Sequence, residues 1–259
     1  MRRSATLTLP LLLVAHGTRD PAGPRVVERL AEAAAARLRV PVHVAYVDVI
    51  GPTVADALRA AGDGPVVALP AFLAAGYHVR TDLPAQIAAT GREEVAVCAP
   101  LGPAPEIVEA MLRRLVSAGW RPGDRVSFAA AGSSDERALA DVRAAARLLG
   151  RRVGRWLTPS YVATASPATA DVCGPADYVA PYLLAPGLFH RRLAELPVAG
   201  VAEPIGAHPG VIDLIARRYR SAVHDRVFLR PNSPHRDSSA RIGVLQRDRL
   251  QGDLTSGAA

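Results

Sequence analysis

The stretch PAFLAAGYHVRTDLP at residues 70–84 places a histidine, His78, shortly after a glycine and just beyond an apolar run. A histidine in that position is presented to a ligand rather than buried. A second histidine, His16, follows the apolar run LLLVA and also adjoins a glycine. Both imidazoles are therefore expected at the carboxyl ends of parallel strands, the edge at which open α/β sheets bind ligands.

Strand and helix patterns alternate outward from this stretch. Four apolar runs predict strands: LLLVA, VPVHVAYVDV, PVVALPAF and EEVAVCAP. Between and after them, apolar residues recur at spacings of three and four among good helix formers. Helices are therefore expected at 21–38, 52–61, 83–89 and 105–119, with a loop at 76–82. Such an alternation predicts a parallel sheet with helices on both faces.

The second half of the chain repeats the first in order and residue type. VSFAAAGSSDE resembles LLLVAHGTRDP, PYLLAPGLFH resembles PAFLAAGYH, and IGAHPGVIDLIARR resembles LGPAPEIVEAMLRR. We therefore expect an α/β fold of two similar doubly wound, Rossmann- or flavodoxin-like parallel-sheet domains. The expected domains are 1–120 and 121–229, followed by a tail at 230–259. The tail is rich in Pro, Ser, Arg and Asp without periodicity, which predicts disorder.

Composition limits the class of partner. The chain has 259 residues, of which 49% are hydrophobic, enough for two cores. Its 31 basic residues, all Arg, outnumber 24 acidic ones and give a formal net charge of +7. This charge suits an acidic partner, and Arg binds carboxylates in bidentate fashion. Aromatic residues make up only 5% and no basic stripe is present, so nucleic acid is not the expected partner.

Cysteine usage and the N-terminal stretch bear on the compartment. Cys98 and Cys173 are too few for a disulfide framework and lack CxxC spacing, so the cytoplasm is expected. The alternative is that MRRSATLTLPLLLVA is a signal peptide. Pro10 interrupts its apolar part, and a first buried parallel strand explains LPLLLVA better. No apolar run approaches the roughly 20 residues that a membrane-spanning helix needs.

Three polar side chains are expected to converge at one edge of the first sheet. His16 follows the first strand, Asp48 closes the second, and His78 comes just after the third. Two imidazoles and a carboxylate suit a divalent transition metal, or a base that works near neutrality. Taken singly, each histidine could be a capped loop residue, and Asp48 could cap the helix that begins at Pro52. The sequence contains no GxGxxG after the first strand, no GxxxxGK and no GxSxG motif.

The segments AHGTRDP, VDVIGPTVADAL and LPAFLAAGYHVRTDLP resemble the sirohydrochlorin chelatases of the CbiX/SirB family. The resemblance covers roughly residues 10–228. It implies two α/β domains that face each other across a cleft. It also implies a class II chelatase, a lyase that inserts cobalt or iron into sirohydrochlorin for cobalamin or sirohaem biosynthesis. Co(II) or Fe(II) would be a substrate, and neither ATP nor another nucleotide would be needed.

The same resemblance assigns roles to residues. His16 and His78 would handle the metal and accept protons, and Asp48 would take the place of the family's assisting carboxylate, which is usually Glu. Sirohydrochlorin carries eight carboxylates, so arginines around the site would attract and orient it. We expect Arg19, Tyr77 and Arg80 to bind the substrate.

The second half lacks the matching chemistry. Ala131 stands where the first half has His16, and a residue near Thr158 stands where it has Asp48. The pattern is similar to the long, fused form of the family, in which one chain supplies both walls of a single site. A monomer built as an internal pseudo-dimer is therefore expected.

Two other interpretations remain open at this point. The chain could be a non-catalytic metal or tetrapyrrole carrier on the same fold. It could also be an unrelated α/β binding protein of periplasmic type, which would require cleavage of the N-terminal stretch. Two histidines of the second half, His190 and His208, lie at or next to positions that match His78 and Ala104 of the first half. They are expected to be structural or substrate-facing.

Overall fold

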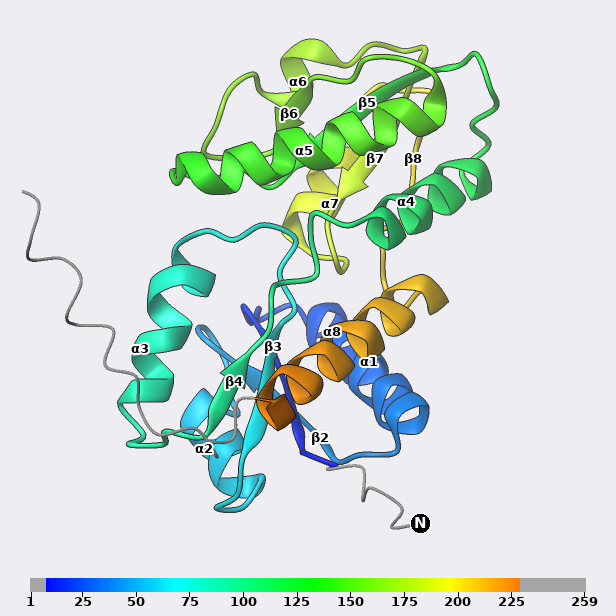
Figure 1. Ribbon diagram of the computed structural model, residues 1–259. Coiled ribbons are helices and arrows are strands. Elements are labelled where there is room, and N and C mark those ends of the chain that lie inside the picture. Colours follow the sequence, from blue (N-terminus) through cyan, green and yellow to red (C-terminus); the bar gives the residue numbers. More distant parts are fainter. Residues whose placement is uncertain (1–7, 229–259) are drawn as a thin grey trace, which may run out of the picture.

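The computed structural model describes residues 8–228, and it shows two four-stranded parallel sheets, one in each half of the chain (Figure 1). The strand order is β2-β1-β3-β4 in the first sheet and β6-β5-β7-β8 in the second. The equal orders confirm the predicted fold of two similar doubly wound α/β units. The strands are β1 (Leu11–Ala15), β2 (Val42–Tyr46), β3 (Val66–Pro70), β4 (Val95–Val97), β5 (Arg125–Ala130), β6 (Pro159–Tyr161), β7 (Asp177–Tyr182) and β8 (Gly200–Val201).

Helices connect the strands and cover both faces of each sheet, as the alternating pattern predicts. They are α1 (Ala22–Leu38), α2 (Val54–Ala60), α3 (Leu83–Ala88), α4 (Pro105–Ser117), α5 (Glu136–Val153), α6 (Thr169–Val172), α7 (Leu188–Ala194) and α8 (Pro209–Phe228). The expected tail at 230–259 lies outside the described residues.

One segment differs from the sequence prediction. The expected loop at 76–82 contains a π-helical turn, η1 (His78–Asp82), which runs directly into α3. The turn forms because the N–H of Leu83 reaches back five residues to the carbonyl of His78. Apolar periodicity does not report such a turn, since none of the η1 side chains is buried.

The alternation of side chains along the strands creates two core layers around the first sheet. Leu11, Leu13 and Ala15 of β1 face the side covered by α1 and α8. Leu12 and Val14 face the opposite side, where they pack with buried residues of α2 and α3. The α1 and α8 side continues without a break into the core of the second sheet, through α4 and α5. One hydrophobic core therefore joins the two halves.

The last helix of each half packs on the sheet of the other half. In Figure 1, α4 lies beside α5 and β7, whereas α8 crosses the first sheet beside α1. The hydroxyl of Tyr219 in α8 donates a hydrogen bond to the carbonyl of Leu9 and accepts one from the N–H of Leu9, just before β1. Arg37 of α1 pairs with Asp213 of α8 at 3.2 Å. The boundary expected between residues 120 and 121 stays a prediction, and in space the two halves are interlocked.

Hydrogen bonds at the strand ends show which positions of the two halves correspond. The N–H of Asp48 bonds to the carbonyl of His16 at 3.0 Å, and the N–H of Ala163 bonds to the carbonyl of Ala131 at 3.0 Å. Ala131 thus matches His16, as the sequence predicts. The match of Thr158 to Asp48 is wrong, because Thr158 precedes β6 whereas Asp48 follows β2. Ala163 is the residue that corresponds to Asp48.

Candidate functional site

The structure brings His16 and His78 together from two neighbouring strands. β1 and β3 pair in parallel, so the segments that follow them leave the same edge of the sheet. The imidazole of His16 is exposed and that of His78 is half-buried. Their ring centroids lie 4.6 Å apart, with the planes at 89°. The two rings therefore form one edge-on pair at the carboxyl edge of the first sheet.

A glycine fixes the backbone that carries His16. Gly17 has φ of 98°, a left-handed conformation that residues with a Cβ rarely adopt. A Cβ at this position would also lie only 2.1 Å from the carbonyl oxygen of Asp48. The turn after His16 therefore requires glycine, and the close approach keeps the ends of β1 and β2 together.

Hydrogen bonds to oxygen atoms determine how each imidazole is presented. His16 Nδ1 lies 2.9 Å from the carbonyl oxygen of Gly17, and His78 Nδ1 lies 2.8 Å from Asp82 Oδ2. Because both oxygens accept, each Nδ1 must carry the proton and donate it. The Nε2 atoms have no hydrogen-bond partner within residues 8–228. In the neutral rings these Nε2 atoms carry the lone pairs, which can accept a proton or bind a metal ion.

Asp82 is held by hydrogen bonds on both of its oxygens. Oδ2 accepts from His78, and Oδ1 accepts from Gln86 Nε2 at 2.8 Å. Partial burial raises the pKa of Asp82, but the hydrogen bonds from His78 and Gln86 outweigh that effect and hold its pKa below the usual value. The carboxylate is therefore charged at neutral pH and accepts the Nδ1–H of His78.

The sequence patterns predicted no role for Asp82 or Gln86. The signal that could have found them is a spacing of four residues, from His78 to Asp82 and from Asp82 to Gln86. This spacing places side chains on one face of a helix. It went unused because residues 76–82 were expected to form a loop.

Asp48 lies at the same edge of the sheet, where its N–H bonds to the carbonyl of His16 at 3.0 Å. Its Oδ1 accepts a hydrogen bond from the N–H of Val49 at 2.7 Å, and its side chain is exposed. Val49 has φ of 70°, an unusual conformation for a β-branched residue. Asp48 does not cap the following helix, since Thr53 and Asp56 form a reciprocal capping box at the start of α2.

The side chains that could coordinate a metal ion at this site are few. Within residues 8–228, no three His, Cys, Asp or Glu side chains are grouped closely enough to hold a metal ion. His16 and His78 together offer two imidazole nitrogens, which suit divalent cobalt or iron. The remaining coordination positions of an ion on this pair would be open to water or to donors of another molecule.

The three residues expected to bind substrate each lie within three positions of His16 or His78 in the chain. Tyr77 is 61% exposed, and its ring centroid is 5.6 Å from that of His78. Arg80 is exposed and donates from Nε to the carbonyl of Ala75 at 2.7 Å, so the loop holds its guanidinium close to the backbone. Arg19 is exposed, three residues after His16.

The second half lies against the loop that carries His78. Asp141 of α5 accepts a hydrogen bond from the N–H of Ala75 at 2.8 Å. The space beside Gly76 is filled by Ala138 of α5, whose Cβ would be 3.3 Å from a Cβ at Gly76. The hydroxyl of Tyr182 in β7 donates to the carbonyl of Leu73 at 2.6 Å. The segment leading to His78 is therefore supported by both halves of the chain.

An ion pair joins the loop after His16 to the second half. Asp20 binds Arg191 of α7 and also accepts a hydrogen bond from the N–H of Ala22 at 3.0 Å, at the start of α1. The hydrogen bond from Arg191, followed by that from Ala22, lowers the pKa of Asp20. The sequence does not predict this ion pair, because no local pattern connects positions so far apart in the chain.

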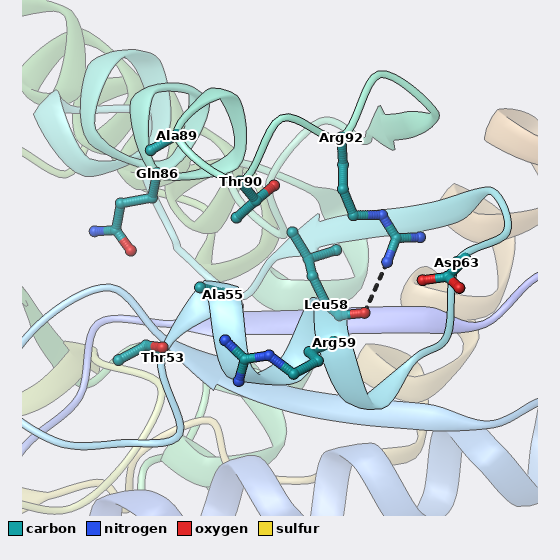
Figure 2. Close-up of a pocket in the computed structure, with 9 residues that line it drawn as sticks. All are labelled: Thr53, Ala55, Leu58, Arg59, Asp63, Gln86, Ala89, Thr90 and Arg92. Carbon is teal, nitrogen blue, oxygen red and sulfur yellow. Dashed lines mark hydrogen bonds between the residues drawn. The ribbon is translucent and has the colours of Figure 1, made fainter.

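A pocket of about 580 Å³ lies between α2 and α3 (Figure 2). Gln86 stands at one end of it, with Arg92 and Asp63 at the other. Arg92 donates from Nη1 to the carbonyl of Leu58 at 2.8 Å and thereby satisfies the end of α2. None of the site residues predicted from the sequence lines this pocket. Its lining residues are Thr53, Ala55, Leu58, Arg59, Asp63, Gln86, Ala89, Thr90 and Arg92.

Known proteins resemble this chain in sequence and in fold. The sequence model of the CbiX family matches residues 10–118. A sirohydrochlorin cobaltochelatase of Methanothermobacter thermautotrophicus is 34% identical over 77 residues, which are 29% of this chain and 54% of the relative. The chain thus spans about half the length of the curated relative it matches.

Solved structures cover more of the chain at lower identity. SirB from Bacillus subtilis with Fe3+ superimposes with a TM-score of 0.74 at 23% identity, over 86% of this chain and 98% of SirB. SirB from Bacillus subtilis subspecies spizizenii in complex with cobalt gives a TM-score of 0.72 at 23% identity and the same coverage. The CbiX family model thus matches the first half of the chain at residues 10–118, and the described residues have the two-sheet fold of SirB.

Proposed function

We propose that this chain is a sirohydrochlorin chelatase that inserts Co(II) or Fe(II) into sirohydrochlorin without ATP. The observation that carries the proposal is the pair of imidazoles at the edge of the half that the CbiX family model matches, 4.6 Å apart, with both Nε2 atoms unpaired within residues 8–228. The named relatives, a cobaltochelatase and two SirB proteins with iron or cobalt, support the same reaction class.

The chemistry of insertion fits this pair. The metal must lose bound water, and two pyrrole N–H groups must lose their protons as their nitrogens take up the ion. An imidazole with an unperturbed pKa of about 6.5 can bind the ion or accept a proton near neutral pH. When His78 Nε2 takes a proton, the ring becomes an imidazolium, and the charged Asp82 at Nδ1 stabilises it. His16 can take the second proton, or hold the ion, through its own Nε2.

Side chains around the pair supply substrate binding. Arg19 and Arg80 would bind carboxylates of sirohydrochlorin. Tyr77 presents an exposed ring beside His78, and such a ring can pack against a flat macrocycle. We assign Asp48 an assisting role at the metal side of the site, which requires its carboxylate to turn away from the N–H of Val49.

We propose that the protein works as a monomer, since the second half supports the loop of His78 in the way a partner subunit would. We expect it in the cytoplasm, on the basis of its two free cysteines. No helix within residues 8–228 has the length and apolar character needed to cross a membrane.

The test is an insertion assay with purified protein. Sirohydrochlorin is mixed with Co(II) or Fe(II) in the absence of nucleotide, and the absorbance change is compared with the rate without protein. The proposal predicts catalytic turnover with no addition beyond the metal. A strict nucleotide requirement, or stoichiometric binding without turnover as expected of a carrier, would contradict it.

A further inference from the structure

Three side chains form a continuous line of hydrogen bonds beside the imidazole pair. His78, Asp82 and Gln86 are spaced by four residues along η1 and α3. The line runs from His78 Nδ1 to Asp82 Oδ2 at 2.8 Å, and from Asp82 Oδ1 to Gln86 Nε2 at 2.8 Å. Every member lies within one short helical segment.

Gln86 connects this segment to the sheet. Its Nε2 also donates to the carbonyl of Val47 at 2.9 Å. The partners of Nε2 are a carbonyl and a carboxylate, which only accept, so the amide must present its NH2 group to them. Val47 is buried, and its own N–H bonds to the carbonyl of Ala15, directly before His16. Gln86 therefore fixes Asp82 relative to the strand ends that carry His16 and Asp48.

We propose that Gln86 is a positioning residue that holds Asp82 in the orientation which keeps the proton of neutral His78 on Nδ1 and the lone pair on Nε2. The inference deepens the proposed chelatase function, on which its kinetic consequence rests. The tautomer of His78 is a property of the protein alone and can be observed without substrate.

Gln86 restrains the rotation of the Asp82 carboxylate. Without Gln86, Asp82 would keep a single hydrogen bond, to the ring it must orient, and its carboxylate could rotate toward solvent. The segment from η1 to α3 would also lose its hydrogen bond to the carbonyl of Val47, directly after β2. Groups that orient a metal-binding or proton-accepting histidine typically contribute about 10- to 100-fold to activity or metal affinity.

The test replaces Gln86 by a side chain of similar length that cannot donate, Gln86→Met. Histidine side chains are labelled with 15N, and proton–nitrogen correlations identify the tautomer of His78 at one fixed pH of about 8.5, with the signal assigned by its loss in His78→Ala. We expect the Nδ1–H form in the wild type and a mixture with the Nε2–H form in Gln86→Met. We also expect kcat for insertion to fall by about tenfold, with KM for sirohydrochlorin little changed.

A matched control lies on the same wall of the pocket in Figure 2. Thr90 lines that pocket, but its hydroxyl donates to the carbonyl of Ile87 and has no hydrogen bond to the line of three. Thr90→Val should leave both the His78 signal and kcat unchanged. If Gln86→Met does not fold, Gln86→Glu replaces the donating amide by an acceptor at equal length and gives the same comparison.

The outcomes separate this inference from the proposed function. A folded Gln86 variant in which His78 keeps the wild-type tautomer signal and kcat stays unchanged would overturn the positioning role. A changed tautomer in a protein whose wild type shows no insertion activity would support the positioning role and refute the chelatase proposal.

Discussion

At the scale of single residues, Asp20 anchors the loop that follows His16 through two contacts. One carboxylate oxygen accepts the N–H of Ala22 at the start of α1, and the other binds Arg191 in the second half. Both contacts favour the charged form, which is why the pKa of Asp20 is lowered. The loop is therefore anchored to its own helix and to the opposite half by the same side chain.

This arrangement predicts a pH-dependent contribution to stability. Because the folded pKa of Asp20 is below its unfolded value of about 3.9, the contribution is fully present above that value and is lost as pH falls through the lowered folded pKa. We expect Asp20→Asn to unfold at lower urea than the wild type at pH 6. The gap between the two midpoints should shrink as pH is lowered toward 3. A gap independent of pH would show that the charge of Asp20 contributes nothing.

At the scale of elements, the exchange of α4 and α8 determines how the halves depend on each other. Ile215 of α8 is fully buried in the core shared by both halves. The thiol of Cys98, just after β4, donates to the carbonyl of Arg218 in α8 at 3.6 Å. Burial raises the pKa of Cys98 to about 12, so a docked α8 keeps this thiol protonated and protected.

Loosening α8 should therefore expose a thiol that belongs to the first half. Ile215→Ala is expected to lower the free energy of unfolding by about 2–5 kcal/mol. It should also speed the reaction of Cys98 with a thiol reagent at pH 8, measured in a Cys173→Ser background. Ser221→Ala, at an exposed position of the same helix, is the control and should change neither quantity appreciably. Equal labelling rates in Ile215→Ala and the control would mean that α8 does not cover Cys98.

The elements also show what sequence patterns can and cannot predict. Strands such as β1 and helices such as α1 follow from apolar periodicity, which reports burial directly. The exchange of α4 and α8 could not be predicted, because an amphipathic helix reveals which face it buries and not which sheet it covers. The π-helical turn η1 escaped prediction for a related reason, since it depends on one backbone hydrogen bond from Leu83 to His78 rather than on a buried face. The match of Thr158 to Asp48 was wrong because it was made by counting residues across a loop, and the sequence pattern does not specify the length of that loop.

At the scale of the whole molecule, two equal sheets carry unequal chemistry. Gly17 and Gly132 have φ of 98° and 104° at matching turns, so the second half keeps the backbone of the first. Ala131 and Ala163 nevertheless occupy the positions of His16 and Asp48. The pairing of His16 with His78 could be anticipated from two strand ends at one sheet edge. The support from Asp141 and Arg191 could not, since it depends on how the halves pack.

His190 and His208 of the second half each contact nearby backbone. His190 Nε2 lies 3.2 Å from the carbonyl of Ala202, and His208 Nδ1 accepts the N–H of Gly210 at the start of α8. Each of these rings thus bonds to nearby backbone through one nitrogen, whereas His16 and His78 face each other with ring centroids 4.6 Å apart.

The most direct test of this asymmetry is the rate of metal insertion into sirohydrochlorin by four single variants, with circular dichroism as the check on folding. His16→Ala and His78→Ala should each lower the rate by a factor on the order of 100 or more, as loss of a positioned acid–base group usually does. His190→Ala and His208→Ala should alter it much less. A folded His190→Ala protein without activity, together with an active His16→Ala protein, would place the active site in the other half and contradict the account.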